Sequence, residues 1–154
     1  MKNKIRVIAI ITGWLFYSLQ IFSQTPDFSG KWILNFEKSN LEHKADGLTG
    51  TIFIIKQEGN KFKWTRYHIF GEKKKKISFK MTADGKMKRV KLLFKAKLEP
   101  EEKGLVSTLW RKNFSNVVHY KFGSSQNELI ADEVFKSKAN NHHNIWVFDR
   151  ELPQ

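Results

Sequence analysis

Residues 25–41, TPDFSGKWILNFEKSNL, contain the pattern that decides the fold. Phe28, Trp32 and Leu34 are separated by even numbers of residues, so in an extended strand their side chains share one face. Gly30 precedes Trp32 by two positions, and a residue without a Cβ lets the backbone bend tightly there. The stretch therefore predicts a first strand that enters a curved sheet and carries a tryptophan to its closed end.

The same alternation of apolar and polar residues continues along the rest of the chain. It is interrupted at short intervals by turn signals that contain Gly or Asn, which is typical of an antiparallel sandwich or barrel. Short connections without crossovers favour an all-β fold made of a single up-and-down β-barrel. We expect nine strands, near residues 30–36, 50–58, 61–70, 75–82, 87–98, 104–113, 116–122, 128–137 and 144–151.

The connections are predicted from their residue types. EGNK at 58–61, ADGK at 83–86 and SSQN at 124–127 have the composition of tight hairpin turns, whereas EPEEKG at 99–104 suggests a longer polar loop. One short helical turn is expected within 37–47. On the strand at 87–98 we expect an inward set consisting of Val90, Leu92, Phe94, Ala96 and Leu98.

Residues 1–24 differ from the remainder, because three basic residues precede an apolar stretch and no acidic residue is present. This is a signal-peptide profile, and the stretch falls short of the roughly 20 residues that span a bilayer. We expect cleavage after Gln24, with an uncleaved anchor as the alternative. The exported product, 25–154, would be one β-barrel domain, soluble in the periplasm or outside the cell, and monomeric. It has no cysteine, so disulfides and thiolate metal sites are excluded.

Gly30, Lys31 and Trp32 resemble the Gly-x-Trp of the first strand in the lipocalin and fatty-acid-binding superfamily. The first strand, the hairpin IKQEGNKFKWTR at 55–66 and the closing WVFDRE at 146–151 are similar to small exported bacterial lipocalin-like domains. The resemblance implies that Arg150 stacks on Trp32, so that Gly30, Trp32 and Arg150 act as structural markers of the fold. It also implies a cavity for a small apolar or amphiphilic ligand at the open end of the barrel, without a permanent cofactor.

The strand KFKWTRYHIF at 61–70 is the first candidate for the ligand site. One face carries Trp64, Arg66 and His68, a set that suits an apolar tail and an anionic head group. If this face points inward, Arg66 is the best candidate for binding the anion. If the opposite face is inner, Arg66 lies on the surface.

Later strands add three further candidates. Tyr120 lies on an apolar face, where its hydroxyl either reaches a ligand or is satisfied within the core. Arg111 and Glu133 also share faces with apolar neighbours and would need each other or a ligand if buried. For Glu133 the outer face is favoured.

Other motifs point to no defined chemistry. His142 and His143 are adjacent, so on a strand they would point to opposite faces; NNHHN at 140–144 is interpreted as a polar hairpin loop and no metal site is expected. No nucleophile elbow, phosphate-binding Gly loop or HExxH motif occurs. An enzyme is therefore not expected, although a barrel enzyme acting on a lipid-like substrate remains an alternative.

The charge of the chain gives a second alternative. Residues 25–154 carry 25 basic and 15 acidic side chains, a formal charge of +10 that attracts polyanions. The strongest run, KKKK at 73–76, is interpreted as a solvated turn, and export argues against a nucleic-acid partner. The second hypothesis is thus a protein with a solid core whose basic exterior binds an anionic glycan or lipid head groups of the cell envelope.

Overall fold

The computed structural model describes residues 25–152, which form eleven strands and no helix. The predicted signal peptide, 1–24, lies outside the described residues. Within the described part, no helix has the length and apolar character needed to cross a membrane. The strands are β1 (Gly30–Leu34), β2 (Asn40–Leu41), β3 (Gly50–Glu58), β4 (Lys61–Phe70), β5 (Lys73–Thr82), β6 (Lys88–Lys91), β7 (Phe94–Glu101), β8 (Gly104–Arg111), β9 (Phe114–Phe122), β10 (Glu128–Ser137) and β11 (Asn141–Arg150).

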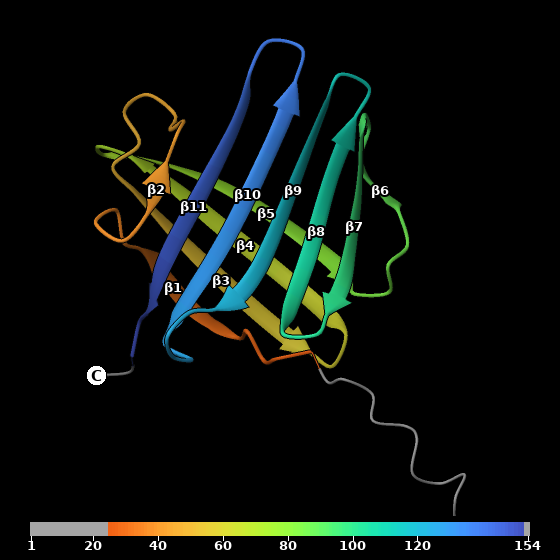
Figure 1. Cartoon of the computed structure of the whole chain (residues 1–154), viewed down its shortest axis with the longest axis horizontal. Helices are drawn as coiled ribbons and strands as arrows, with labels where there is room; N and C mark the ends of the chain where they lie inside the picture. The colour runs from red at the N-terminus through yellow and green to blue at the C-terminus, as the bar shows by residue number, and fades with distance from the viewer. Residues whose placement is uncertain (1–24, 153–154) are drawn as a thin grey trace, which may run out of the picture.

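The strands form one antiparallel sheet in the order β5-β4-β3-β1-β11-β10-β9-β8-β7-β6, with β2 paired to β11 outside this path. The sheet curls so that β7 to β11 cross over β1, β3, β4 and β5 (Figure 1). The predicted all-β, antiparallel, up-and-down barrel is confirmed. It is nearly rather than fully closed, because β5 and β6 are the two ends of the order and share no ladder of hydrogen bonds.

One end of the barrel is closed around Trp32, which is fully buried and packs near Phe122. The guanidinium of Arg150 lies over the Trp32 ring at 4.1 Å from its centroid, and its Nη1 donates a 2.6 Å hydrogen bond to the carbonyl of Ser29. Gly30 is required here for two reasons. Its φ of +152° is one that other residues rarely adopt, and a Cβ would lie 2.6 Å from Arg150 Nη1.

The core above this end is aromatic. Phe53 on β3 is almost completely buried, and its ring centroid lies 5.6 Å from that of Trp64 and 6.0 Å from those of Tyr120 and Phe148. These side chains come from four different strands, so their burial joins the two crossing halves of the sheet. Burying each large apolar side chain stabilises the fold by about 1.5–3 kcal/mol.

The predicted strand at 87–98 is wrong in one respect, because it is two strands. β6 ends at Lys91, the register shifts between Arg89 and Lys91, and Leu92 and Leu93 form the turn before Phe94. Leu92 is therefore 83% exposed instead of pointing inward. The stretch contains neither Gly nor Pro, so its residue types carry no turn signal.

Three of the predicted connections also differ from the structure. Residues 37–47 contain no helix and instead include β2. EPEEKG is not a long loop, because β7 continues to Glu101 and pairs directly with Gly104 of β8. ADGK does not join two paired strands, since it connects β5 to β6 across the gap in the sheet.

Candidate functional site

The barrel encloses a cavity of about 330 Å³. This volume is at the small end of the range of about 300–1,000 Å³ that is usual for ligand pockets. The wall is mostly aromatic and aliphatic, and its non-aromatic polar side chains come from β4, β8, β9 and β10. The lining residues are Phe53, Trp64, Arg66, His68, Ile77, Phe79, Met81, Ala96, Ser107, Thr108, Leu109, Asn116, Val118, Tyr120, Glu133 and Trp146.

Arg66 lines this cavity, so the face of β4 that carries Trp64, Arg66 and His68 is the inner one. Arg66 is next to Phe53 in the β3–β4 register, and its guanidinium carbon lies 4.6 Å from the centroid of the Phe53 ring. Nη2 donates a 3.3 Å hydrogen bond to the hydroxyl oxygen of Tyr120. Among residues 25–152, no carboxylate forms an ion pair with Arg66, so its charge is balanced by no direct partner.

Tyr120, which accepts the hydrogen bond from Arg66, packs against Trp64. Their rings meet edge to face with centroids 5.0 Å apart, and both side chains are buried. The indole Nε1 of Trp64 is buried without a hydrogen-bond partner in the described part of the chain. A buried N–H without an acceptor is costly, and a polar ligand atom or a water would satisfy it.

Glu133 is on the inner face, so the expectation of an outer position was wrong. Its Oε1 accepts a 2.7 Å hydrogen bond from Asn116 Nδ2, and its Oε2 accepts from Trp146 Nε1 at 2.7 Å and Asn144 Nδ2 at 3.1 Å. Three N–H donors thus satisfy both oxygens of this carboxylate inside the barrel. The register explains the mistake: Glu133 pairs with Val118, which faces inward, so its own side chain must do the same.

Asn116 is a polar lining residue that was not among the predicted site residues. Its Nδ2 is committed to Glu133, and its buried Oδ1 has no partner among the described residues. The signal was present, because Asn116 precedes Val118 and Tyr120 on one strand by two and four positions and must share their face. The cavity therefore holds one unpaired acceptor in addition to the unpaired donor of Trp64.

His68 lies on the same inner face of β4. Its Nδ1 is 3.2 Å from Oγ1 of the buried Thr51. Burial, together with the positive charges of Arg66 and Lys75, lowers the pKa of His68 from 6.5 to about 4, against the opposing effect of Glu133. The imidazole is therefore neutral at ordinary pH and contributes hydrogen bonds rather than charge.

Arg111 does not line the cavity. It is exposed at the last position of β8, where its guanidinium carbon lies 5.5 Å from the centroid of Phe94. The structure thus brings Trp64, Arg66, His68 and Tyr120 together and leaves Arg111 outside the cavity.

The two adjacent histidines are in strand β11 instead of a loop. The ring of His142 stacks on Phe135 at 4.8 Å, whereas His143 Nε2 is 2.7 Å from Asp132 Oδ1. Within residues 25–152 no three His, Asp or Glu side chains are grouped to hold a metal ion.

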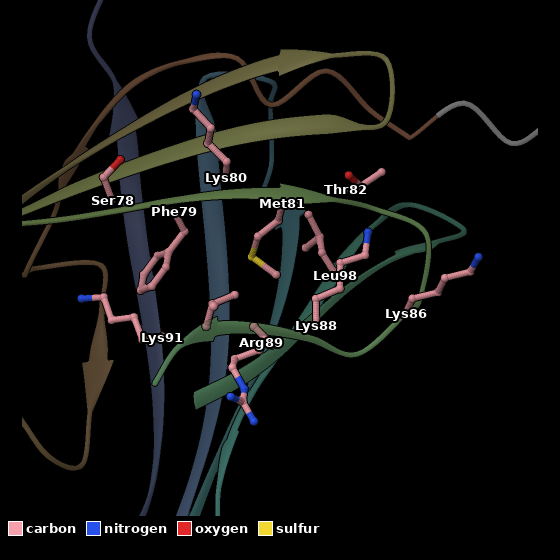
Figure 2. Close-up of a pocket in the computed structure, with 12 residues that line it drawn as sticks. Ser78, Phe79, Lys80, Met81, Thr82, Lys86, Lys88, Arg89, Lys91 and Leu98 are labelled. Carbon is pink, nitrogen blue, oxygen red and sulfur yellow. The ribbon is translucent and has the colours of Figure 1, made fainter. Parts of the chain in front are cut away.

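A second pocket, of about 280 Å³, occupies the gap between β5 and β6. Figure 2 shows Phe79 and Met81 reaching from β5 into this gap, with Lys88, Arg89 and Lys91 on the opposite side. Phe79, Met81 and Ala96 line both the gap pocket and the inner cavity. The gap is thus separated from the cavity only by side chains.

Comparison with known proteins supports the fold. Neither a family model nor a curated relative matches the chain. The zebrafish ileal bile-acid-binding protein complexed with cholic acid is similar, with a TM-score of 0.55 at 15% identity over 80% of this chain and 98% of that one. Fatty-acid-binding protein 1 of Echinococcus granulosus gives a TM-score of 0.56 at 17% identity, over 81% of this chain and 98% of that one. The Schistosoma mansoni fatty-acid-binding protein in complex with arachidonic acid gives a TM-score of 0.54 at 14% identity, over 81% of this chain and 96% of that one. The chain therefore has the antiparallel β-barrel fold of these bile-acid-binding and fatty-acid-binding proteins.

Proposed function

We propose that this protein is an exported binding protein for a small amphiphile with an anionic head group. One observation carries the proposal: the guanidinium of Arg66 faces an apolar cavity and has no carboxylate partner among the described residues. Removing a cation from water into an apolar cavity costs free energy unless an anion pairs with it. A carboxylate would accept charge-assisted hydrogen bonds from Arg66 and from the hydroxyl of Tyr120.

The remaining cavity groups suit the rest of such a ligand. Phe53, Phe79 and Met81 offer apolar contacts for a short tail, and the small volume favours medium over long chains. Two unpaired atoms could bind a second polar group of the ligand. Asn116 Oδ1 would accept a hydrogen bond from it, and Trp64 Nε1 would donate one to it. The cavity favours this function over that of a protein with a solid core, and fatty-acid-binding and bile-acid-binding proteins share the fold.

Export is part of the same proposal and rests on the composition of residues 1–24. We place the protein in the periplasm or outside the cell, as a monomer without a permanent cofactor.

Calorimetric titration of 25–154 with decanoic acid and with its methyl ester tests the role of Arg66. The two molecules differ in charge but hardly in apolar surface. The acid should bind at least about tenfold more tightly, because a hydrogen bond to a charged group contributes about 1.5–3 kcal/mol. Arg66→Gln should abolish this difference, and Tyr120→Phe should reduce it.

Arg111→Gln is the matched control, because it removes an arginine that lies outside the cavity. It should leave both affinities unchanged. Equal binding of acid and ester by the unaltered protein, or undiminished preference for the acid in Arg66→Gln, would contradict the proposal.

A further inference from the structure

The segment beside the β5–β6 gap is strongly basic. From Lys80 to Lys97 there are seven lysine and arginine residues and a single acid, Asp84. Asp84 is already paired with Lys88, at 2.6 Å. The other cations of this segment that line the gap pocket are Lys80, Lys86, Arg89 and Lys91.

The same region concentrates exposed apolar side chains. Five large apolar side chains are exposed in residues 25–152, and four of them belong to this edge of the barrel. Leu92 and Leu93 form the β6–β7 turn and are 83% and 58% exposed, while Met87 precedes β6 and Trp110 lies on β8. Scattered exposed residues need no explanation, but such clustering marks an interaction surface.

The positive charges are also placed unfavourably for a protein without a partner. Arg89 lies directly opposite Lys95 in the β6–β7 register, and like charges at opposed positions of a sheet repel each other. Lys95 is in turn next to Trp110, with Nζ 5.7 Å from the ring centroid. An anionic surface would relieve this repulsion, and an exposed tryptophan next to a lysine suits the boundary between head groups and acyl chains.

We infer that β6 and the β6–β7 turn form a docking surface for an anionic lipid bilayer. Arg89, Lys91 and Lys95 would bind phosphate head groups, and Leu92 and Leu93 would enter the apolar boundary below them. A soluble glycan would use the cations but would offer no apolar phase to the two leucines. A bilayer uses both features of the surface.

Docking in this orientation would place the β5–β6 gap next to the lipid. Lys91 Nζ lies 5.9 Å from the ring centroid of Phe79, at the boundary of the gap, and Phe79 also lines the inner cavity. Figure 2 shows these two side chains facing each other from opposite sides of the pocket. The exchange of an amphiphile through the gap rests on the proposed function, whereas docking itself does not.

Flotation with vesicles, without added ligand, tests the docking surface. The protein 25–154 should bind vesicles of phosphatidylglycerol and phosphatidylcholine in equal amounts, and should not bind phosphatidylcholine alone. Arg89→Glu with Lys91→Glu should weaken binding at least about tenfold. The matched control is Lys136→Glu with Lys138→Glu, which makes the same change of net charge on exposed residues of the β10–β11 hairpin. This control should weaken vesicle binding much less.

Insertion of the turn is measured separately. Because the chain has no cysteine, Leu92→Cys can carry a single polarity-sensitive dye. The dye should shift to shorter wavelength on anionic vesicles, whereas the same dye on Lys138→Cys should not. Leu92→Ser with Leu93→Ser should weaken binding, and Leu152→Ser, at another exposed leucine, should not.

Three results would overturn the inference. These are no binding to anionic vesicles, equal losses in the two charge-reversal variants, or no dye shift at position 92. The titration with the acid and the ester contains no vesicles, and the flotation contains no added ligand. Either experiment can therefore fail while the other succeeds, so failure of docking and failure of the proposed function are distinguishable.

Discussion

Arg66 and Glu133 line the same cavity, but their charges are stabilised differently. Glu133 accepts hydrogen bonds from three side-chain N–H donors, whereas Arg66 donates one hydrogen bond to Tyr120 and lies on the ring of Phe53. Glu133 is therefore part of the wall, and Arg66 retains donors for a ligand. The indole N–H of Trp146 donates a hydrogen bond to Glu133, whereas the indole N–H of Trp64 has no acceptor among the described residues.

The neutral state of His68 predicts a pH dependence of stability. Its pKa is about 4 in the folded protein against an ordinary value of 6.5, so the unfolded chain takes up a proton first as the pH falls. The contribution of His68 to the free energy of unfolding should therefore be fully present above pH 6.5 and should decline as the pH falls towards 4. Urea denaturation across this range should show a smaller decline in His68→Gln than in the unaltered protein.

His119→Gln is the control for this experiment, because His119 is exposed and bonds Glu101 on the outside of the barrel. It should retain the decline attributed to His68. An identical slope in His68→Gln and the unaltered protein would show that burial of His68 does not produce the effect.

At the scale of the element, the β6–β7 hairpin shows how a continuous apolar pattern can conceal a turn. Leu92 and Leu98 have the same parity in the sequence, yet Leu92 is exposed in the turn and Leu98 is completely buried on β7. The β6–β7 turn separates their environments, because Leu92 follows the end of β6 at Lys91 and precedes the start of β7 at Phe94. Parity therefore predicts a shared face only within one continuous strand.

A pair of leucine substitutions measures this difference. Leu98→Ala should lower the free energy of unfolding by about 2–5 kcal/mol, because it leaves a cavity in the core. Leu92→Ala should change it by no more than about 0.5 kcal/mol. Chemical denaturation of both variants checks the prediction, and comparable losses would mean that Leu92 is buried in solution.

For the whole molecule, the incomplete closure of the sheet is the main feature. Within residues 25–152, β5 pairs only with β4, and β6 pairs only with β7. Near the gap, Ala83 forms an isolated parallel bridge to Leu98 of β7. The described sheet thus has its free edges where the gap pocket lies, and all its other long strands are paired on both sides.

Hydrogen exchange should reveal this edge. Amides of the four-residue β6 should exchange much faster than those of β9, because β9 is hydrogen-bonded on both sides along most of its length. Exchange measured by NMR or mass spectrometry on the ligand-free protein checks this. Equal protection of β6 and β9 would indicate that the gap is closed in solution.

The sequence by itself determined the all-β class, the antiparallel hairpin order, most strand positions and the grouping of Trp64, Arg66 and His68 on one face. These follow from local physics, because period-two alternation and turn residues act over a few neighbours. Only the tertiary structure decided which face of β4 is inner, that Glu133 faces the cavity, that Arg111 is outside the cavity and that β5 and β6 do not pair. Each of these depends on the register and curvature of strands that are distant in sequence, and the side chains of one strand alone do not encode them.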